Sequence, residues 1–235
     1  MNKSFCARVA ILFCAITSTT YAYDPRQLER FIITHQCERC DLNELNFSPE
    51  ILGSDDFTES VLTGAYVYGS SIERLNFSNV NAQQLQGLGL MLHNNELSNA
   101  DFSYADLPNL KVTLWNQGEY VNFMGANIDE ANFSYSQLYA PNFFEASMSS
   151  AVLYHVNWPY AYLYGARLRG ANLTYAVLNH ANLQYADLSN ALLNHANLSD
   201  ANLLGAMVTD EQLANTASIC NAVLPDGSIG YCVAL

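Results

Sequence analysis

Residues 171–185 read Ala-Asn-Leu-Thr-Tyr, Ala-Val-Leu-Asn-His and Ala-Asn-Leu-Gln-Tyr. Each group of five has a leucine at its centre and an alanine two positions before it, and two of the three have an asparagine directly before the leucine. An amphipathic α-helix repeats every 3.6 residues and a strand every two, so neither accounts for a period of five. The period predicts that each pentad forms one side of a coil, with the centre and the small residue pointing inward and the other three residues pointing outward.

The repeat continues far beyond this stretch. Between Phe123 and Val208 there are 18 successive pentads with an apolar centre, and 14 of them carry alanine at the minus-two position. The core centres that we single out in this block are Phe123, Ile128, Phe133, Leu138, Leu163, Leu168, Leu173, Leu178, Leu183, Leu188, Leu193, Leu198 and Leu203.

An earlier block of centres, from Leu42 to Val112, keeps the period in a different phase. The phase slips by one residue near 113–122. We interpret the slip as a bulge or short loop within one domain, because the period is the same on both sides. The centres expected between Ala82 and Gly89 are alanine and glycine, so the pattern leaves the conformation of 80–91 and of 113–122 open.

The pattern resembles the consensus Ala-(Asp/Asn)-Leu-x-x of the pentapeptide-repeat family. The resemblance implies an all-β solenoid, a right-handed quadrilateral β-helix with four pentads in each coil. Stacked large side chains would fill its axis at close-packed density, and the backbone would bond to the coils on both sides. The repeat region, 41–208, would then form about eight coils and a rod ~40 Å long at the usual strand spacing.

A solenoid exposes its core at both ends, so we expect short helical caps there. The N-terminal cap is predicted at 23–40, with Asp24 as N-cap, Pro25 at the first helical position and Gln27 at the third. The C-terminal cap is predicted at 209–235.

The C-terminal cap has two parts in this prediction. A capping box from Thr209 to Gln212 opens a helix that continues to about Ala217. A strong turn signal, Pro-Asp-Gly, then predicts a hairpin from Ala222 to Tyr231.

Residues 1–22 read as a secretory signal peptide. Lys3 and Arg8 supply positive charge, a short apolar stretch follows, and residues 20–22 end in a small-x-small cleavage site. We therefore expect an exported bacterial protein, periplasmic or extracellular, with no membrane span after removal of the signal. A buried N-terminal helix and a lipoprotein processed at Cys14 are the alternatives.

Four cysteines remain after the signal, and an even number in an exported chain suggests disulfides. The Cα atoms of a disulfide lie within roughly 7 Å of each other, so a long rod allows only the local pairs Cys37–Cys40 and Cys220–Cys232. The tail from Cys220 also resembles the Cys-x-x-x-(Leu/Met)-Pro-Asp-Gly-Ser tail of exported and cyanobacterial family members. Alternatives for the first pair are a thioredoxin-like redox motif and a zinc site with His35, for which a fourth ligand is not evident.

Residues 20 apart in one register should lie one above the other. One such column and its neighbours form a candidate binding strip for a protein or a glycan, consisting of Tyr135, Tyr154, His155, Tyr162, Tyr164, Tyr175 and His195. The alternative is a ladder of stacked surface side chains that only stabilises the sheet.

Composition and motifs narrow the function. The formal net charge of −13 disfavours non-specific binding to nucleic acid. No catalytic motif is visible and a filled solenoid offers no deep cleft, so we expect no catalytic residue, no cofactor and no metal site. The leading hypothesis is a non-catalytic exported scaffold for another macromolecule, in the first place a protein. The sequence defines neither that partner nor the oligomeric state.

Two other function classes stay open. The family resemblance implies a DNA-mimicking inhibitor or protector of DNA gyrase, as in the quinolone-resistance members. Two features disfavour that role. The secretion signal would remove the protein from the cytoplasm, where gyrase acts, and a cysteine-containing C-terminus replaces the helical dimerisation module of those members. An enzyme is the third class.

Overall fold

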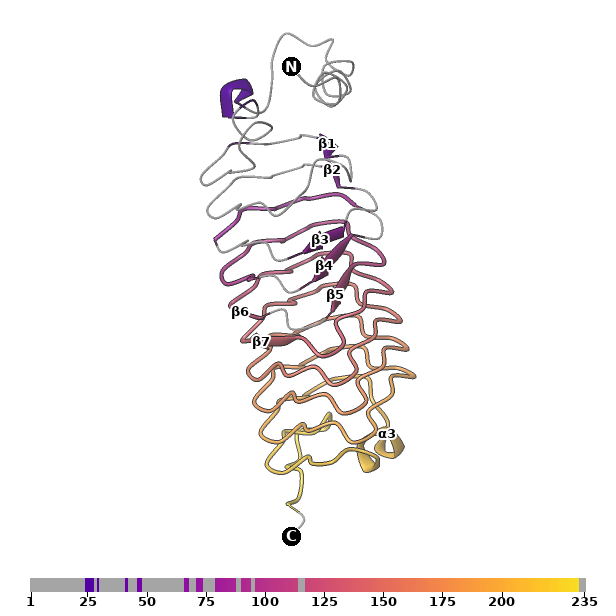
Figure 1. The fold of residues 1–235 in the computed structure, drawn as a ribbon. Coiled ribbons are helices and arrows are strands. Elements are labelled where there is room, and N and C mark those ends of the chain that lie inside the picture. The colour runs from indigo at the N-terminus through magenta and orange to yellow at the C-terminus, as the bar shows by residue number, and fades with distance from the viewer. Residues whose placement is uncertain are drawn as a thin grey trace.

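The computed structural model describes residues 24–27, 29, 41, 46–47, 66–67, 71–73, 79–87, 90–93, 96–113 and 117–232. From residue 79 onward these residues form one continuous stack of coils (Figure 1). The regular elements among all the described residues are β1 (Asn46–Phe47), β2 (Tyr66–Val67), β3 (Ser71–Glu73), β4 (Met91–His93), β5 (Lys111–Thr113), β6 (Gln117–Glu119), β7 (Gln137–Tyr139) and α3 (Asp210–Ala214).

Parallel ladders with an offset of 20 residues hold the coils together. Asn122 pairs with Asn142, which pairs with Tyr162, and this pattern continues along the stack. Phe123 N donates to Asn142 O at 2.7 Å and Asn142 N donates to Val121 O at 2.8 Å, so each of the two coils donates a hydrogen bond to the other. Most extended segments are single bridges rather than strands, because a turn follows every fifth residue.

Four ladders give the solenoid four faces, which we name by their paired residues. Face 1 contains residues 117, 137, 157, 177 and 197, face 2 contains 122, 142, 162, 182 and 202, face 3 contains 127, 147, 167, 187 and 207, and face 4 contains 132, 152, 172 and 192.

The corners between faces are four-residue turns. At one of them Ala126 N donates to Phe123 O at 3.0 Å, and Gly125 has a φ of 64°. A positive φ at the third residue is the feature of a type II turn. Tyr135 and His155 adopt the same left-handed conformation, with φ of 63° and 54°. This conformation costs an L-residue about 1 kcal/mol, and the coils on both sides hold it in place.

All 13 of the core centres singled out above are buried, with exposed fractions of 2% or less. Phe123 stacks between Phe102 and Phe143 at centroid distances of 5.1 and 5.3 Å. Trp158 stacks on Phe143 at 4.8 Å, and its indole N–H donates to the buried hydroxyl of Ser136 at 2.9 Å. The single polar atom of this large side chain is therefore paired within the core.

The weak region of the repeat continues the same coil. Asn81 pairs with Asp101, and Gln86 pairs with Asp106. The minus-two residues Val80, Leu85 and Leu90 are large and buried here, whereas the centres 82 and 87 are alanine and glycine. Large and small residues have exchanged positions at 80/82 and 85/87, and such an exchange conserves the total volume of each pair.

The phase slip adds one residue to a coil without interrupting the ladder. Met91 pairs with Lys111 at an offset of 20, and Lys111 pairs with Asn132 at an offset of 21. Asp101 and Asn122 are likewise 21 residues apart.

The helix α3 begins at the predicted capping box. Gln212 N donates to Thr209 Oγ1 at 3.2 Å, and Thr209 N donates to Gln212 Oε1 at 2.9 Å. Gln212 Nε2 also donates to Leu188 O and Ala191 O, each at 2.8 Å, and thereby fixes the helix to the adjacent coil. The helix ends three residues earlier than the predicted Ala217, because the ladder resumes at the C-cap, where His195 N donates to Asn215 O at 2.8 Å.

At the other end, residues 25–27 and 29 are helical. Asp24 is the N-cap, since its carboxylate accepts from Arg26 N at 2.9 Å. The Gln27 side chain accepts from Asp41 N, and Asp24 N donates to Asp41 O at 3.2 Å. Gln27 therefore fixes the first helical turn to the start of the repeat.

The chain ends in the predicted hairpin. Val223 and Ile229 form an antiparallel bridge, and Gly230 N donates to Ala222 O at 2.8 Å. Cys220 and Cys232 form the predicted disulfide, with 4.2 Å between their Cα atoms. The other predicted pair, Cys37–Cys40, lies outside the described residues.

Candidate binding face

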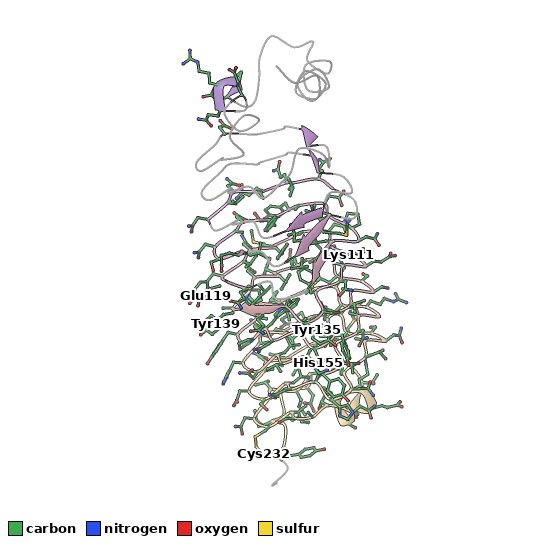
Figure 2. The ribbon with its side chains drawn as sticks, viewed as in Figure 1. Lys111, Glu119, Tyr135, Tyr139, His155 and Cys232 are labelled. Carbon is green, nitrogen blue, oxygen red and sulfur yellow. A yellow bond between two sulfur atoms is a disulfide. The ribbon has the colours of Figure 1, made fainter. Side chains whose placement is uncertain are left out.

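The column predicted from the 20-residue offset stacks along one corner. Tyr135 and His155 stack at 5.4 Å, His155 and Tyr175 at 4.6 Å, and Tyr175 and His195 at 4.9 Å, with interplanar angles of 16° or less. Tyr135 and His155 lie one above the other in Figure 2. Because each ring covers its neighbour, the edges of these rings are what a partner can reach.

Tyr154 joins this column from the side. Its ring is edge-on to those of Tyr135, His155 and Tyr175, at 5.6, 4.5 and 6.0 Å. Partial burial, and then the neighbouring phenols of Tyr135 and Tyr175, raise the pKa of the Tyr154 hydroxyl above its usual value. The five residues, Tyr135, Tyr154, His155, Tyr175 and His195, form what we call the first corner column.

The other two residues of the predicted strip belong to a separate group on face 2. Tyr162 and Tyr164 stack against Phe144 at 5.8 and 5.5 Å, and Tyr164 is edge-on to Tyr185. From the sequence we expect them on a face neighbouring the column. In the structure face 1 lies between the column and this group, so the predicted strip is two surfaces rather than one.

A second corner column was missed in the sequence analysis. Tyr139 contacts Tyr120 at 6.0 Å and Tyr160 at 5.5 Å, and Tyr160 stacks on His180 at 4.8 Å. The offset of 20 between Tyr160 and His180 was a usable signal. We call Tyr120, Tyr139, Tyr160 and His180 the second corner column.

Face 1 lies between the two corner columns. In β7, Gln137 follows Tyr135 by two residues, and the strand ends at Tyr139. The same order recurs one coil later, where Asn157 follows His155 and precedes Tyr160. Figure 2 shows Tyr135 and His155 on one side of this face and Glu119 and Tyr139 on the other.

Three residues before the core centres of face 1, Gln117, Gln137 and Asn157, differ from their counterparts on face 2 in their hydrogen bonds. On face 2, Asn122 and Asn142 accept from the backbone N–H two residues ahead, at 3.1 and 3.0 Å, and Asn142 also donates to Asn122. On face 1 the side chains of Gln117, Gln137 and Asn157 are exposed and form no hydrogen bond within the described part of the chain.

Neighbouring residues explain why the amides of Asn157 and Gln117 form no local hydrogen bond. Pro159 occupies the position whose N–H would bond to Asn157, and proline has no such group. At the equivalent position after Gln117, the N–H of Glu119 donates instead to Ser98 Oγ at 3.2 Å.

A hollow of about 350 Å³ opens on face 1. The three amides form part of its lining, together with Glu96, Glu119, Tyr139 and Pro159. Glu96 accepts from Ser98 N at 3.0 Å and from the Ser98 hydroxyl at 2.6 Å. No Lys or Arg occurs at the described positions of face 1, so the hollow carries negative charge without a counter-charge.

Among the described residues, no group of three or more His, Cys, Asp or Glu is arranged to hold a metal ion. In the same part of the chain, no helix has the length and apolar character needed to cross a bilayer.

Coils of four pentads, joined by parallel ladders around a filled axis, define a solenoid of the quadrilateral β-helix class. The family model "Pentapeptide repeats (8 copies)" matches residues 146–184 and 176–210. Residues 146–210 of this chain are therefore pentapeptide repeats.

Several solved structures are similar to this chain. HetL, a pentapeptide-repeat protein involved in heterocyst differentiation regulation in the cyanobacterium Nostoc sp. strain PCC 7120, is 24% identical, with a TM-score of 0.41. The match covers 89% of this chain and 100% of HetL. A thylakoid-lumen pentapeptide-repeat protein of Arabidopsis thaliana is 25% identical over 46% of this chain and 79% of its own, with a TM-score of 0.37.

The plasmid-mediated fluoroquinolone resistance protein QnrB1 is 12% identical over 77% of this chain and 89% of its own, with a TM-score of 0.31. No curated protein matches the sequence. These likenesses do not bear on what the present chain binds.

Proposed function

We propose that this protein is a non-catalytic, exported scaffold that binds another macromolecule through face 1 and the two corner columns. In this proposal the chain is a right-handed β-helix of about eight coils with a helical cap at each end. The observation that carries the proposal is the first corner column, in which exposed Tyr and His rings are held in order by the coils beneath them.

Pre-ordered aromatic side chains favour binding for a physical reason. A flexible side chain loses about 0.5–1.5 kcal/mol of free energy when a partner immobilises it. The rings of the corner column are already stacked at fixed distances, so most of that loss occurs on folding. Tyrosine is also enriched at protein interfaces, since its ring gives contact area and its hydroxyl gives a hydrogen bond.

Export is supported by two features of the chain. The first 22 residues have the composition of a secretory signal. The disulfide between Cys220 and Cys232 is of the kind that persists in an oxidising compartment. We therefore place the protein in the periplasm or outside the cell.

Affinity capture with the oxidised, signal-free protein as bait tests this function. The variant Tyr135→Ser/Tyr175→Ser/His195→Ser should keep the circular dichroism spectrum of the parent and lose the captured partner. Tyr104→Ser/Tyr185→Ser is the matched control, since it removes exposed tyrosines from the corner that follows face 2. An unchanged set of partners with the triple variant would rule out the first corner column.

A second candidate, mimicry of DNA toward DNA gyrase, is favoured by the acidic charge of −13. A gyrase supercoiling assay with the purified protein tests it directly. Cell fractionation separates the two candidates, because gyrase is cytoplasmic and the leading proposal requires export.

A further inference from the structure

The three amides of face 1 form an ordered row of unused hydrogen-bonding groups. Gln117, Gln137 and Asn157 occur on successive coils, and the ladder pairs each with the next. Neighbouring groups in such a ladder are about 4.8 Å apart. Each amide offers two donors and one acceptor oxygen, so the row presents both kinds of group at every step along the axis.

The charge of the hollow restricts what can bind to this row. Glu96 and Glu119 supply carboxylates, and the described positions of face 1 contain no Lys or Arg. A phosphate, a uronic acid or a nucleic acid bound in the hollow would be repelled by these two carboxylates. Hydroxyl groups suit the site, because they can donate to a carboxylate and both donate to and accept from an amide.

The backbone of face 1 is not available to a peptide strand. Leu138 N donates to Asn157 O at 3.1 Å and Trp158 N donates to Val177 O at 2.9 Å, so the coils already use these groups. Recognition by strand addition, in which main-chain hydrogen bonds give the affinity, is therefore excluded at this face.

Two apolar surfaces complete the hollow. Tyr139, whose side chain is 42% exposed, and Pro159 both line it. A tyrosine ring combines apolar area with a polar tip and suits a ligand that has both kinds of surface. The volume of about 350 Å³ is within the range of small-ligand sites.

We infer that face 1 binds an uncharged oligosaccharide, with its hydroxyl groups on the row of Gln117, Gln137 and Asn157 and a sugar ring against Tyr139. This inference rests on the proposed function, since it names the ligand of the proposed binding face. A chain of sugars lying along the axis would meet one amide per coil.

Isothermal titration of the full, oxidised protein with cellotetraose and chitotetraose tests the inference. We expect binding of at least one of these neutral sugars and none of tetragalacturonate, which is anionic. Gln137→Leu and Asn157→Leu should each weaken binding about tenfold, the value of one good hydrogen bond. Gln86→Leu is the matched control, because it removes an exposed glutamine from the same pentad position on face 3.

Three results would overturn the inference: no binding of either neutral sugar, tighter binding of the anionic sugar or of a neutral tetrapeptide, or equal affinities in Gln137→Leu and Gln86→Leu. If either of the first two results is obtained while a partner is still captured through the first corner column, the glycan inference fails and the proposed function stands. If sugar binding depends on Gln137 but the corner variants still capture the same partners, the glycan site is supported. The role of the first corner column in the proposed function is then rejected.

Discussion

Phe102, Phe123 and Phe143 stack inside the coils at 5.1 and 5.3 Å, and Tyr135, His155 and Tyr175 stack at a corner at 5.4 and 4.6 Å. The distances are similar because both columns repeat once per coil. The phenylalanines are fully buried, whereas Tyr135 is 53% exposed. Ring stacking is thus a consequence of coil spacing, and burial decides whether a column stabilises the fold or remains available to a partner.

The largest effect on stability is expected from the phenylalanine column inside the coils. Phe123→Ala removes a ring that contacts Phe102, Phe133 and Phe143 and leaves a cavity that rigid coils cannot close. We expect a loss of about 3–5 kcal/mol in the free energy of unfolding, measured by denaturant titration. A loss as small as that of a corner variant would show that the inner column is not the main source of stability.

The second largest loss of stability is expected from breaking the hydrogen bond between Ser136 and Trp158 inside the core. Ser136→Ala leaves the buried indole N–H of Trp158 without its acceptor, which should cost about 1–3 kcal/mol. The double variant Ser136→Ala/Trp158→Phe removes both partners. We expect it to be less destabilised than the sum of the two single variants, in a double-mutant cycle by thermal unfolding.

Corner glycines give a smaller effect that depends on the ring beside them. A Cβ at Gly205 would lie 2.6–2.7 Å from ring atoms of Tyr185, whereas a Cβ at Gly170 would meet nothing closer than Ser150 Oγ at 3.7 Å. Both have positive φ, so each alanine variant should lose about 1 kcal/mol. We expect Gly205→Ala to lose about 0.5 kcal/mol more, because the ring must move. Equal midpoints in denaturant would contradict this difference.

The outer column should contribute least to stability. Tyr175→Ser removes an exposed ring that contacts His155 and His195, and we expect a change of about 0.5 kcal/mol or less. The same variant should weaken partner capture strongly. If unfolding shifts by several kcal/mol, the column is a structural ladder and the binding interpretation loses its support.

The raised pKa of Tyr154 gives the smallest effect, and its sign follows from linkage. The neutral phenol is favoured in the folded state, so its contribution is complete below the ordinary tyrosine pKa of about 10 and is lost as pH rises through the raised value. Tyr154→Phe should therefore make stability less dependent on pH between about 9 and 11. Denaturant titrations of both proteins across this range measure the difference, and parallel curves would contradict it.

The period of five was sufficient to predict the core, because each centre has one inward direction whatever its neighbours are. The Cys220–Cys232 pair and the first corner column followed from position along the coil. The exchange of sizes at Val80 and Ala82 was not predictable, since it depends on the sum of two volumes and not on either residue.

The candidate site was harder to read from the sequence than the core. Asn157 and Asn142 are the same residue at the same pentad position, and only the proline two residues after Asn157 removes its local partner. The second corner column was hidden because Ala140 interrupts it and Tyr139, one position earlier in its pentad, fills the gap. The first feature depends on a single residue within the pentad, and the second depends on which side chains meet across coils.

The antiparallel bridge between Val223 and Ile229 has a consequence for assembly. Asn221 N donates to Gly230 O at 3.1 Å and Leu224 N donates to Ser228 O at 2.8 Å, so the tail occupies backbone groups at the last coil, at the end of the rod seen in Figure 1. An exposed edge would let a second molecule add its own coil and start a filament. The folded-back tail blocks such growth at this end, and the disulfide to Cys232 keeps it in place.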